Sequence, residues 1–246
     1  MAATSTYRAI ILAAGRGSRL GALTSRRPKC LLPLADETVL ARQLRLLREV
    51  GVHDVVLVVG HLAANIAASV QGQEGIALVS NLQHEGNNSL SSLAAAKDHL
   101  AGDVLVLNCD LAYERQMLES LLSAECDASL VVSKTLAQAP DVRVQIRDRR
   151  LVDIGKHIPA DESDAVFCHA GLVREAELVQ FSCALDQTAA SGMRTGWSRV
   201  LRRMAAEGVA VGAVDYDGPW WNINSVRDYA AAQQWARTKT DSRTRL

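Results

Sequence analysis

Short apolar runs alternate with helix-like stretches along the first half of the chain. Four runs have the length of buried strands, namely residues 8–14, 54–59, 76–80 and 103–107. Three stretches between them have the composition or spacing of helices, namely residues 39–50, 63–70 and 89–100. Strands that alternate with helices predict βαβ units and a mostly parallel sheet.

The pattern changes after about residue 133. Residues 142–146 alternate apolar and polar positions, residues 148–150 are polar, and residues 151–154 are apolar again. Two short strands joined by a polar turn predict a β-hairpin. We therefore expect an α/β protein with a Rossmann-like, mostly parallel sheet flanked by helices and a small antiparallel hairpin appendage.

Composition narrows the class of protein. Lysine plus arginine equals aspartate plus glutamate at 27 each, so no basic excess indicates a nucleic-acid partner. The five cysteines are scattered and never in C-x-x-C spacing, which argues against a disulfide framework or a zinc site. The N-terminus does not resemble a signal peptide, and the apolar runs are too short to span a membrane. A cytoplasmic enzyme is the expectation.

A glycine-rich loop follows the first predicted strand and reads Leu12-Ala13-Ala14-Gly15-Arg16-Gly17-Ser18-Arg19-Leu20. It leaves the carboxyl edge of the sheet, where open α/β sheets bind ligands. Gly15 and Gly17 let the backbone approach phosphate oxygens, and Arg19 adds hydrogen-bond donors. Lys29 is a second cation, held in a stiff segment by Pro28. This pattern indicates a phosphate site.

Three other interpretations of the loop fit the sequence less well. A dinucleotide-binding turn needs its third glycine at position 20, which is Leu20, and Pro28 and Pro33 interrupt the helix that should follow. A P-loop needs a G-K-[ST] motif, which the chain lacks. A purely structural glycine turn leaves Arg19 and Lys29 without a role.

A resemblance to a known family is carried by two motifs. They are Ala13-Ala14-Gly15-x-Gly17-x-Arg19-Leu20 and Pro28-Lys29-x-Leu31-x-Pro33. In order and spacing they resemble the signature of MobA-like and sugar-phosphate nucleotidyltransferases. The resemblance implies a GT-A-like fold in which the loop wraps a nucleoside triphosphate through Leu12, Ala13, Ala14, Gly15, Arg16 and Gly17. It also implies that Arg19 and Lys29 stabilise the charge that develops during nucleotidyl transfer.

Asp110 follows the fourth predicted strand, where a carboxylate can hold Mg²⁺ or cap the next helix. The resemblance favours Mg²⁺, because the family has a metal-binding aspartate at such a strand end. It also implies a second ligand near residues 220–229. There the chain has Asn224, and less favourably Asn222, in place of the usual acidic residue. Helix capping by Asn224 is the alternative.

The start of the third predicted helix is rich in polar side chains, namely Asn87, Asn88, Ser91 and Ser92. They are typical of a helix N-terminus, but they can also recognise a base or ribose. Residues 81–93 resemble a narrower branch of the family, the phosphocholine and phosphonate cytidylyltransferases of the aminoethylphosphonate or phosphonoformate type. The resemblance implies CTP as the nucleotide.

The acceptor is expected to bind beyond the hairpin. In related enzymes a lysine after this hairpin contacts the acceptor phosphate, which implies that role for Lys156. Trp197 and Arg194 are further candidates, although solvated surface is the ordinary state of such arginines. An aromatic content of 4% gives little support for a choline cage, so a small phosphonate or phosphate ester is favoured.

We therefore predict one domain over residues 1–246. It comprises a nucleotide-binding core at about 1–133, an acceptor-binding part with the hairpin at about 134–215, and a closing segment with a C-terminal helix at 216–237. The predicted activity is Mg²⁺-dependent transfer of CMP from CTP with release of pyrophosphate. A sugar-1-phosphate or molybdopterin nucleotidyltransferase and a non-catalytic nucleotide sensor are the alternatives. Association into a homodimer is left open.

Overall fold

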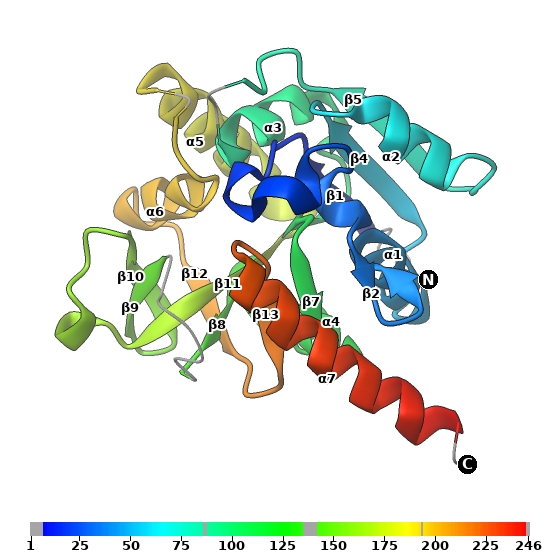
Figure 1. The fold of residues 1–246 in the computed structure, drawn as a ribbon. Helices are drawn as coiled ribbons and strands as arrows, with labels where there is room; N and C mark the ends of the chain where they lie inside the picture. The colour runs from blue at the N-terminus through cyan, green and yellow to red at the C-terminus, as the bar shows by residue number, and fades with distance from the viewer. Residues whose placement is uncertain (1–6, 86–87, 135–141, 193, 245–246) are drawn as a thin grey trace, which may run out of the picture.

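A nine-stranded sheet forms the centre of the computed structural model, which describes residues 7–85, 88–134, 142–192 and 194–244. The strands of this sheet are β1 (Tyr7–Ala13), β4 (Asp54–Val59), β5 (Ile76–Ser80), β6 (Asp103–Asn108), β8 (Ala128–Ser133), β9 (Arg143–Arg147), β10 (Arg150–Gly155), β11 (Ala165–Val173) and β12 (Val211–Asp215). Their spatial order is β5-β4-β1-β6-β11-β8-β12-β10-β9 (Figure 1).

The first four strands in this order are parallel, as the apolar runs predict. Ile10 of β1 lies beside Val56 of β4 on one side and Val106 of β6 on the other. Because β1 and β6 run in the same direction, both end at the same edge of the sheet. The glycine-rich loop and Asp110 therefore leave the sheet side by side.

The second half of the sheet is mixed rather than mostly parallel. Strand β11 runs antiparallel to β6 and β8, whereas β12 runs parallel to β8. The predicted hairpin is confirmed as β9 and β10, joined by a two-residue turn at Asp148 and Arg149 with φ of 51° and 60°. Strand β9 also pairs with β11, so the hairpin is continuous with the main sheet.

Helices cover both faces of the sheet. One face carries α1 (Val39–Glu49), α2 (Ala63–Val70) and α4 (Arg115–Leu122). The other carries α3 (Ser89–Ala95), α5 (Leu178–Ala190) and α6 (Ser198–Ala206). Helix α3 is shorter than predicted, because the chain tightens into a 3-10 turn at Lys97–His99. The result is a three-layer arrangement of helices, sheet and helices.

The C-terminal segment closes one side of the molecule (Figure 1). Strand β13 (Trp220–Asn222) pairs with β7 (Leu111–Tyr113), and α7 (Val226–Thr244) packs against β2 (Pro33–Leu34), which pairs with β3 (Glu37–Thr38). Helix α7 continues beyond residue 237, where we expected it to end. An ion pair of 2.8 Å between Lys239 and Glu114 anchors the added turns. No helix among the described residues is long and apolar enough to cross a membrane.

Candidate active site

A cleft of about 1170 Å³ opens at the edge where β1 and β6 end. Most of the predicted site residues line it, namely Leu12, Ala14, Gly15, Arg16, Gly17, Arg19, Lys29, Asn88, Ser91, Ser92, Asp110, Lys156, Arg194, Trp197, Asn222 and Asn224. Ala13 does not line the cleft, because its side chain is buried in the core on the α1 face of the sheet. Asn87 falls outside the described residues. Predicted site residues from distant parts of the chain therefore lie together in one cleft.

The glycine-rich loop fits tightly against Lys29. Gly17 has a φ of 65°, and a Cβ atom there would lie 3.3 Å from Cβ of Lys29, so a larger residue would meet both strain and crowding. At Gly15 a Cβ atom would meet no heavy atom within 4 Å. Glycine at position 15 instead leaves the backbone open to the cleft.

Four of the predicted residues meet in one polar cluster. The ammonium of Lys29 forms an ion pair with Asp110 and donates to Oδ1 of Asn224 at 2.9 Å. Arg19 donates to the same Asn224 oxygen at 2.6 Å. Lys29 is only 8% exposed, so its interactions are poorly screened by water. Two cations and a carboxylate thus converge beneath the glycine-rich loop.

Hydrogen bonds to backbone groups fix the loop that carries Asp110. Nε2 of Gln43 in α1 donates to the carbonyls of Asn108 and Leu111, each at 3.0 Å, and so fixes both sides of the loop. The carbonyl of Asp110 accepts from the amide of Ile223 at 2.9 Å. The next element is strand β7 rather than a helix, so Asp110 is not a helix cap.

Asn224 is free of the capping role as well. Ser225 precedes α7, and its Oγ accepts from the amide of Asp228 at 3.2 Å, while Oδ2 of Asp228 accepts from the amide of Ser225 at 2.8 Å. This reciprocal pair is a capping box. The side chain of Asn224 is therefore directed into the polar cluster and is 8% exposed.

The cluster fits a divalent cation of the Mg²⁺ kind. Oδ2 of Asp110 and Oδ1 of Asn224 already converge on one positive centre, the ammonium of Lys29. A carboxylate and an amide oxygen are ligands that Mg²⁺ accepts, and it takes few protein ligands when phosphates complete its shell. No group of three or more His, Cys, Asp or Glu side chains suited to a metal occurs in the described part of the chain. The donor set therefore suits a metal shared with phosphate.

Asn222 is oriented differently from Asn224. Its amide satisfies its neighbours when Nδ2 donates to both oxygens of Asp110, at 3.2 and 3.3 Å, and Oδ1 accepts from Nε2 of His169 at 3.0 Å. The amide oxygen then points away from the carboxylate. This arrangement favours Asn224 over Asn222 as the second oxygen ligand.

The start of α3 combines structural and exposed groups. Ser91 and Ser92 are buried and accept from Nδ2 of Asn81 at 3.1 and 3.3 Å. These two serines therefore join the end of β5 to α3 and also line the cleft, and their role in reading the nucleotide stays a prediction. Asn88 is exposed at the cleft, and its side chain makes no capping bond to α3. Recognition of the base by Asn88 stays a prediction.

The far end of the cleft carries the expected acceptor residues. Lys156 and Arg194 are exposed and line it. Trp197 is only 1% exposed; its ring lies edge-on to Phe167 and its Nε1 donates to Asn108 at 3.2 Å. Trp197 therefore forms part of the wall of the cleft, and direct contact of its ring with an acceptor stays a prediction.

Cys109, next to Asp110, is a neutral thiol. A hydrogen bond with Cys30 and then burial raise the pKa of the Cys109 thiol well above its usual value. A thiolate would be needed for nucleophilic attack or metal binding. Cys109 therefore has a packing role.

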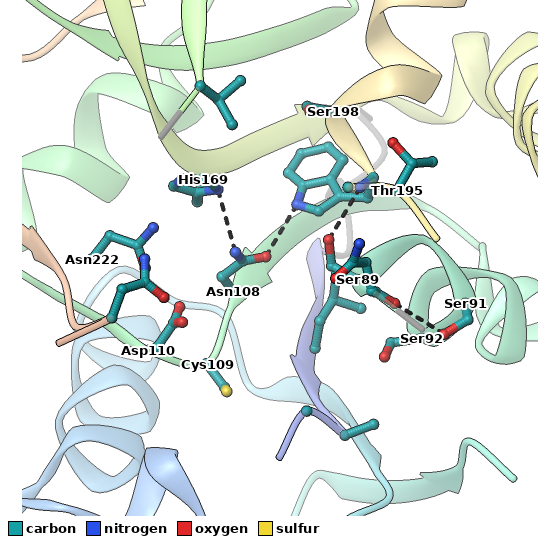
Figure 2. A pocket seen from close by; sticks show the side chains of 18 of the residues that line it. Ser89, Ser91, Ser92, Asn108, Cys109, Asp110, His169, Thr195, Ser198 and Asn222 are labelled. Atoms are coloured by element: carbon teal, nitrogen blue, oxygen red, sulfur yellow. Dashed lines mark hydrogen bonds between the residues drawn. The ribbon is translucent and has the colours of Figure 1, made fainter. Parts of the chain in front are cut away.

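Asn108 and His169 are two of the polar cleft residues that the sequence did not single out. Asn108 ends the buried strand β6, and His169 lies within the apolar strand β11. Figure 2 shows Asn108 between His169 and the loop that carries Asp110. A polar residue inside an apolar run is a signal that could have identified both.

The chain is similar to a family of known proteins. The model of the MobA-like NTP transferase domain matches residues 9–151. A CMP-5'-(3-aminopropyl)phosphonate synthase of Streptomyces rubellomurinus is 36% identical over 70% of this chain and 27% of its own length. A bifunctional IPC transferase and DIPP synthase of Rubrobacter xylanophilus is 29% identical over 95% of this chain and 53% of its own. This chain therefore spans about half or less of these two relatives.

The fold also matches a solved structure. A CTP:phosphocholine cytidylyltransferase from Streptococcus pneumoniae superposes with a TM-score of 0.77 at 22% identity, over 93% of this chain and 98% of the other. That likeness confirms the predicted nucleotidyltransferase fold. Since the family model covers more than half of the residues, the chain belongs to the family of MobA-like NTP transferase domains.

Proposed function

We propose that the protein is a Mg²⁺-dependent cytidylyltransferase that transfers CMP from CTP to a small phosphonate or phosphate ester and releases pyrophosphate. The observation that carries this proposal is the cluster of Arg19, Lys29, Asp110 and Asn224 beneath the glycine-rich loop. The buried cation Lys29 and the exposed cation Arg19 are directed at one point, where positive charge can stabilise a transferring phosphoryl group. Residues 1–133 would bind the nucleotide, and residues 134–215 would bind most of the acceptor.

The reaction is a direct displacement. An oxygen of the acceptor phosphate or phosphonate attacks the α-phosphorus of CTP and forms a new P–O bond. The bond between the α-phosphorus and the bridging oxygen breaks, and pyrophosphate leaves with the electron pair. Lys29 and Arg19 stabilise the negative charge of this transition state. The acceptor oxygen is already ionised, so no general base is required.

Asp110 and Asn224 would hold Mg²⁺. When bound, the metal adds positive charge to the phosphate oxygens and helps to orient them. Lys29 then needs to separate from Asp110, and its ammonium becomes available to phosphate. In this mechanism the ion pair between Lys29 and Asp110 opens when the substrate binds.

The preference for CTP is supported by two observations. The Streptomyces relative and the Streptococcus structure carry names that refer to CMP or CTP. Asn88 exposes an amide to the cleft, and an amide can pair with the polar edge of cytosine. The sequence of residues 81–93, which contains this asparagine, also resembles that of the cytidylyltransferase branch of the family.

The acceptor is proposed to be anionic rather than a choline ester. Among the described residues, the Phe, Tyr and Trp side chains that line the cleft are Phe167 and Trp197, and each is 1% exposed. Neither offers a face for a quaternary ammonium group. Lys156 and Arg194 supply positive charge at the same end. These features favour a phosphonate or a small phosphate ester.

A pyrophosphate-release assay tests the proposal. Each nucleoside triphosphate is combined with Mg²⁺ and with 2-aminoethylphosphonate, phosphonoformate, phosphocholine or a sugar 1-phosphate. We expect release with CTP and a phosphonate or small phosphate ester. Asp110→Asn should abolish this release, whereas Asp98→Asn, at an exposed aspartate after α3, should leave it unchanged.

Other results of the same assay contradict the proposal. Release only with a sugar 1-phosphate and UTP or dTTP would assign the protein to the sugar-phosphate type. Release only with GTP would favour the molybdopterin type. Binding of a nucleotide without release from any acceptor would make it a sensor.

A further inference from the structure

His169 is turned into the cleft by an irregularity of strand β11. The register of β11 against β8 shifts between Phe167 and Gly171, and His169 within this bulge has a φ of 58°. Histidine is one of the few residues that adopt this region with any frequency, and a bulge re-aims a side chain. The backbone thus bears a local strain that brings one imidazole to the polar side of an otherwise apolar strand.

The imidazole is the centre of a continuous chain of hydrogen bonds. Nε1 of Trp197 donates to Oδ1 of Asn108 at 3.2 Å, and Nδ2 of Asn108 meets Nδ1 of His169 at 3.3 Å (Figure 2). In the orientation of the Asn222 amide that satisfies its neighbours, Oδ1 accepts from Nε2 of His169 at 3.0 Å and from Nδ2 of Asn224 at 2.8 Å, and Nδ2 donates to Asp110 at 3.2 and 3.3 Å. The chain runs from the wall of the acceptor end to the proposed metal ligand.

The direction of every bond in this chain is fixed by its two ends. An indole N–H can only donate, so Asn108 must accept with its oxygen and present its amide hydrogens to His169. Nδ1 of His169 is then the acceptor, and the ring proton must reside on Nε2. At the other end a carboxylate can only accept, so Asn222 donates to it and accepts from His169. Both arguments assign the same tautomer to His169, the one with the ring proton on Nε2.

We propose that His169 is a positioning residue which, as the neutral Nε2–H tautomer, holds Asn222 in the orientation that donates to Asp110. The proposal rests on the proposed nucleotidyl transfer, because it assigns His169 an effect on the catalytic carboxylate. Without the donor on His169, the Asn222 oxygen keeps Nδ2 of Asn224 at 2.8 Å but loses its second donor, so the amide more easily turns its oxygen toward the carboxylate. Two oxygens would then face each other, and Asp110 would lose a fixed position.

The consequence should appear in turnover rather than in affinity for the nucleotide. The chain of hydrogen bonds links His169 to Asp110 through Asn222, and the glycine-rich loop contributes most of the triphosphate contacts in the proposed complex. Residues that hydrogen-bond to a metal ligand and so orient it typically contribute about 10-fold to 100-fold in metal affinity or activity. We expect His169→Phe to lower kcat by about that factor and to change KM for CTP by less than about threefold.

A set of variants separates positioning from simple packing. His169→Gln keeps an N–H near the place of Nε2 and should recover most of the lost kcat. Asn222→Ala should resemble His169→Phe, and the double variant should be no slower than Asn222→Ala alone, because both remove the same link. His53→Phe is the matched control at an exposed histidine before β4, and it should behave like the wild type.

A spectroscopic measurement tests the tautomer without any reaction. Nitrogen-15 NMR of the histidine rings should contain one signal pair of the neutral Nε2–H form that disappears in His169→Phe. In Asn222→Ala that pair should lose its characteristic shift or broaden. If His169→Phe folds poorly, the other two variants still test the proposal. Asn222→Ala keeps the imidazole of residue 169, and His169→Gln places an amide there.

Different results overturn different claims. If the wild type releases no pyrophosphate with any acceptor, the proposed function fails. If the wild type is active but His169→Phe turns over normally, or if the effects of His169→Phe and Asn222→Ala multiply, the positioning role fails alone. A neutral Nδ1–H signal for His169 would also overturn it, because the chain of hydrogen bonds could not then run in the stated direction.

Discussion

Lys29 is the residue on which the proposed chemistry depends most. Its ammonium is the point where the carboxylate of Asp110 and the amide oxygen of Asn224 converge, and Gly17 packs against its side chain. Burial strengthens these interactions, because the local dielectric is low. A cation in this place can neutralise phosphate charge at little reorganisation cost.

Replacement of Lys29 by alanine should therefore remove catalysis and leave the fold intact. Loss of one such donor typically lowers turnover by about 10² to 10³, and we expect Lys29→Ala to lose at least that much. Pyrophosphate release measures the loss, and thermal unfolding checks the fold. Lys97→Ala is the control, because Lys97 pairs with Asp186 on the surface at 2.6 Å. Near-normal turnover in a folded Lys29→Ala protein would remove Lys29 from the mechanism.

Individual site residues could be predicted where a motif joins them to a strand end. Arg19 and Lys29 follow the first strand and Asp110 follows the fourth, so parallel topology brings them together. Asn108 and His169 could not be paired in this way, because no motif joins them and a bulge in β11 turns the histidine. Register irregularities depend on tertiary contacts, which a single sequence does not specify.

Helix α6 and the hairpin are joined by one polar clamp. Arg202 of α6 donates to Oδ1 of Asp153 in β10 at 2.6 Å, and His157 contacts Oδ2 of Asp153 at 2.8 Å. Partial burial would raise the pKa of Asp153, but the hydrogen bonds from His157 and Arg202 outweigh it and hold the pKa below its usual value. The clamp links two elements that line the acceptor end of the cleft.

Asp153→Asn should lower the melting temperature in a pH-dependent way. A carboxyl group whose pKa is lowered by folding stabilises the protein above its ordinary pKa of about 3.9, and this contribution disappears as the pH falls through the folded pKa. The difference from wild type should be full at neutral pH and shrink below about pH 4. Asp161→Asn, at an exposed site, should show a smaller difference. If the difference in melting temperature between Asp153→Asn and the wild type stays constant as the pH is lowered, the charge of Asp153 does not stabilise the clamp.

Helices and strands could be predicted where a short stretch of sequence carries the whole apolar pattern of the element. The strands of the first half and the hairpin follow from periodicity within a few residues. The pairing of β9 with β11 does not, because Val144 and Ala165 meet through folding of a distant segment. The contact of Lys239 in the last turns of α7 with Glu114 likewise joins distant parts of the chain, so local periodicity does not predict it.

The whole molecule places its cleft where the two halves of the sheet meet. Strands β1 and β6 of the parallel half bring the glycine-rich loop and Asp110, whereas β11 of the mixed half brings His169. The C-terminal segment adds Asn222 and Asn224 across β7. A nucleotide in the cleft would contact all three parts, so its binding should stabilise the fold as a unit.

A panel of nucleoside triphosphates therefore tests the proposal at the scale of the molecule. A ligand at 100 times its Kd adds about 2.7 kcal/mol to the free energy of unfolding, which for a chain of this size raises the melting temperature by about 5–10 °C. We expect CTP with Mg²⁺ to give the largest rise. In Arg19→Ala the rise should shrink, because a phosphate ligand is lost, whereas Arg48→Ala at the exposed end of α1 should retain it. A larger rise with GTP, UTP or dTTP would reject cytosine recognition while leaving the triphosphate site intact, and equal shifts for all nucleotides would indicate that only the phosphates are bound.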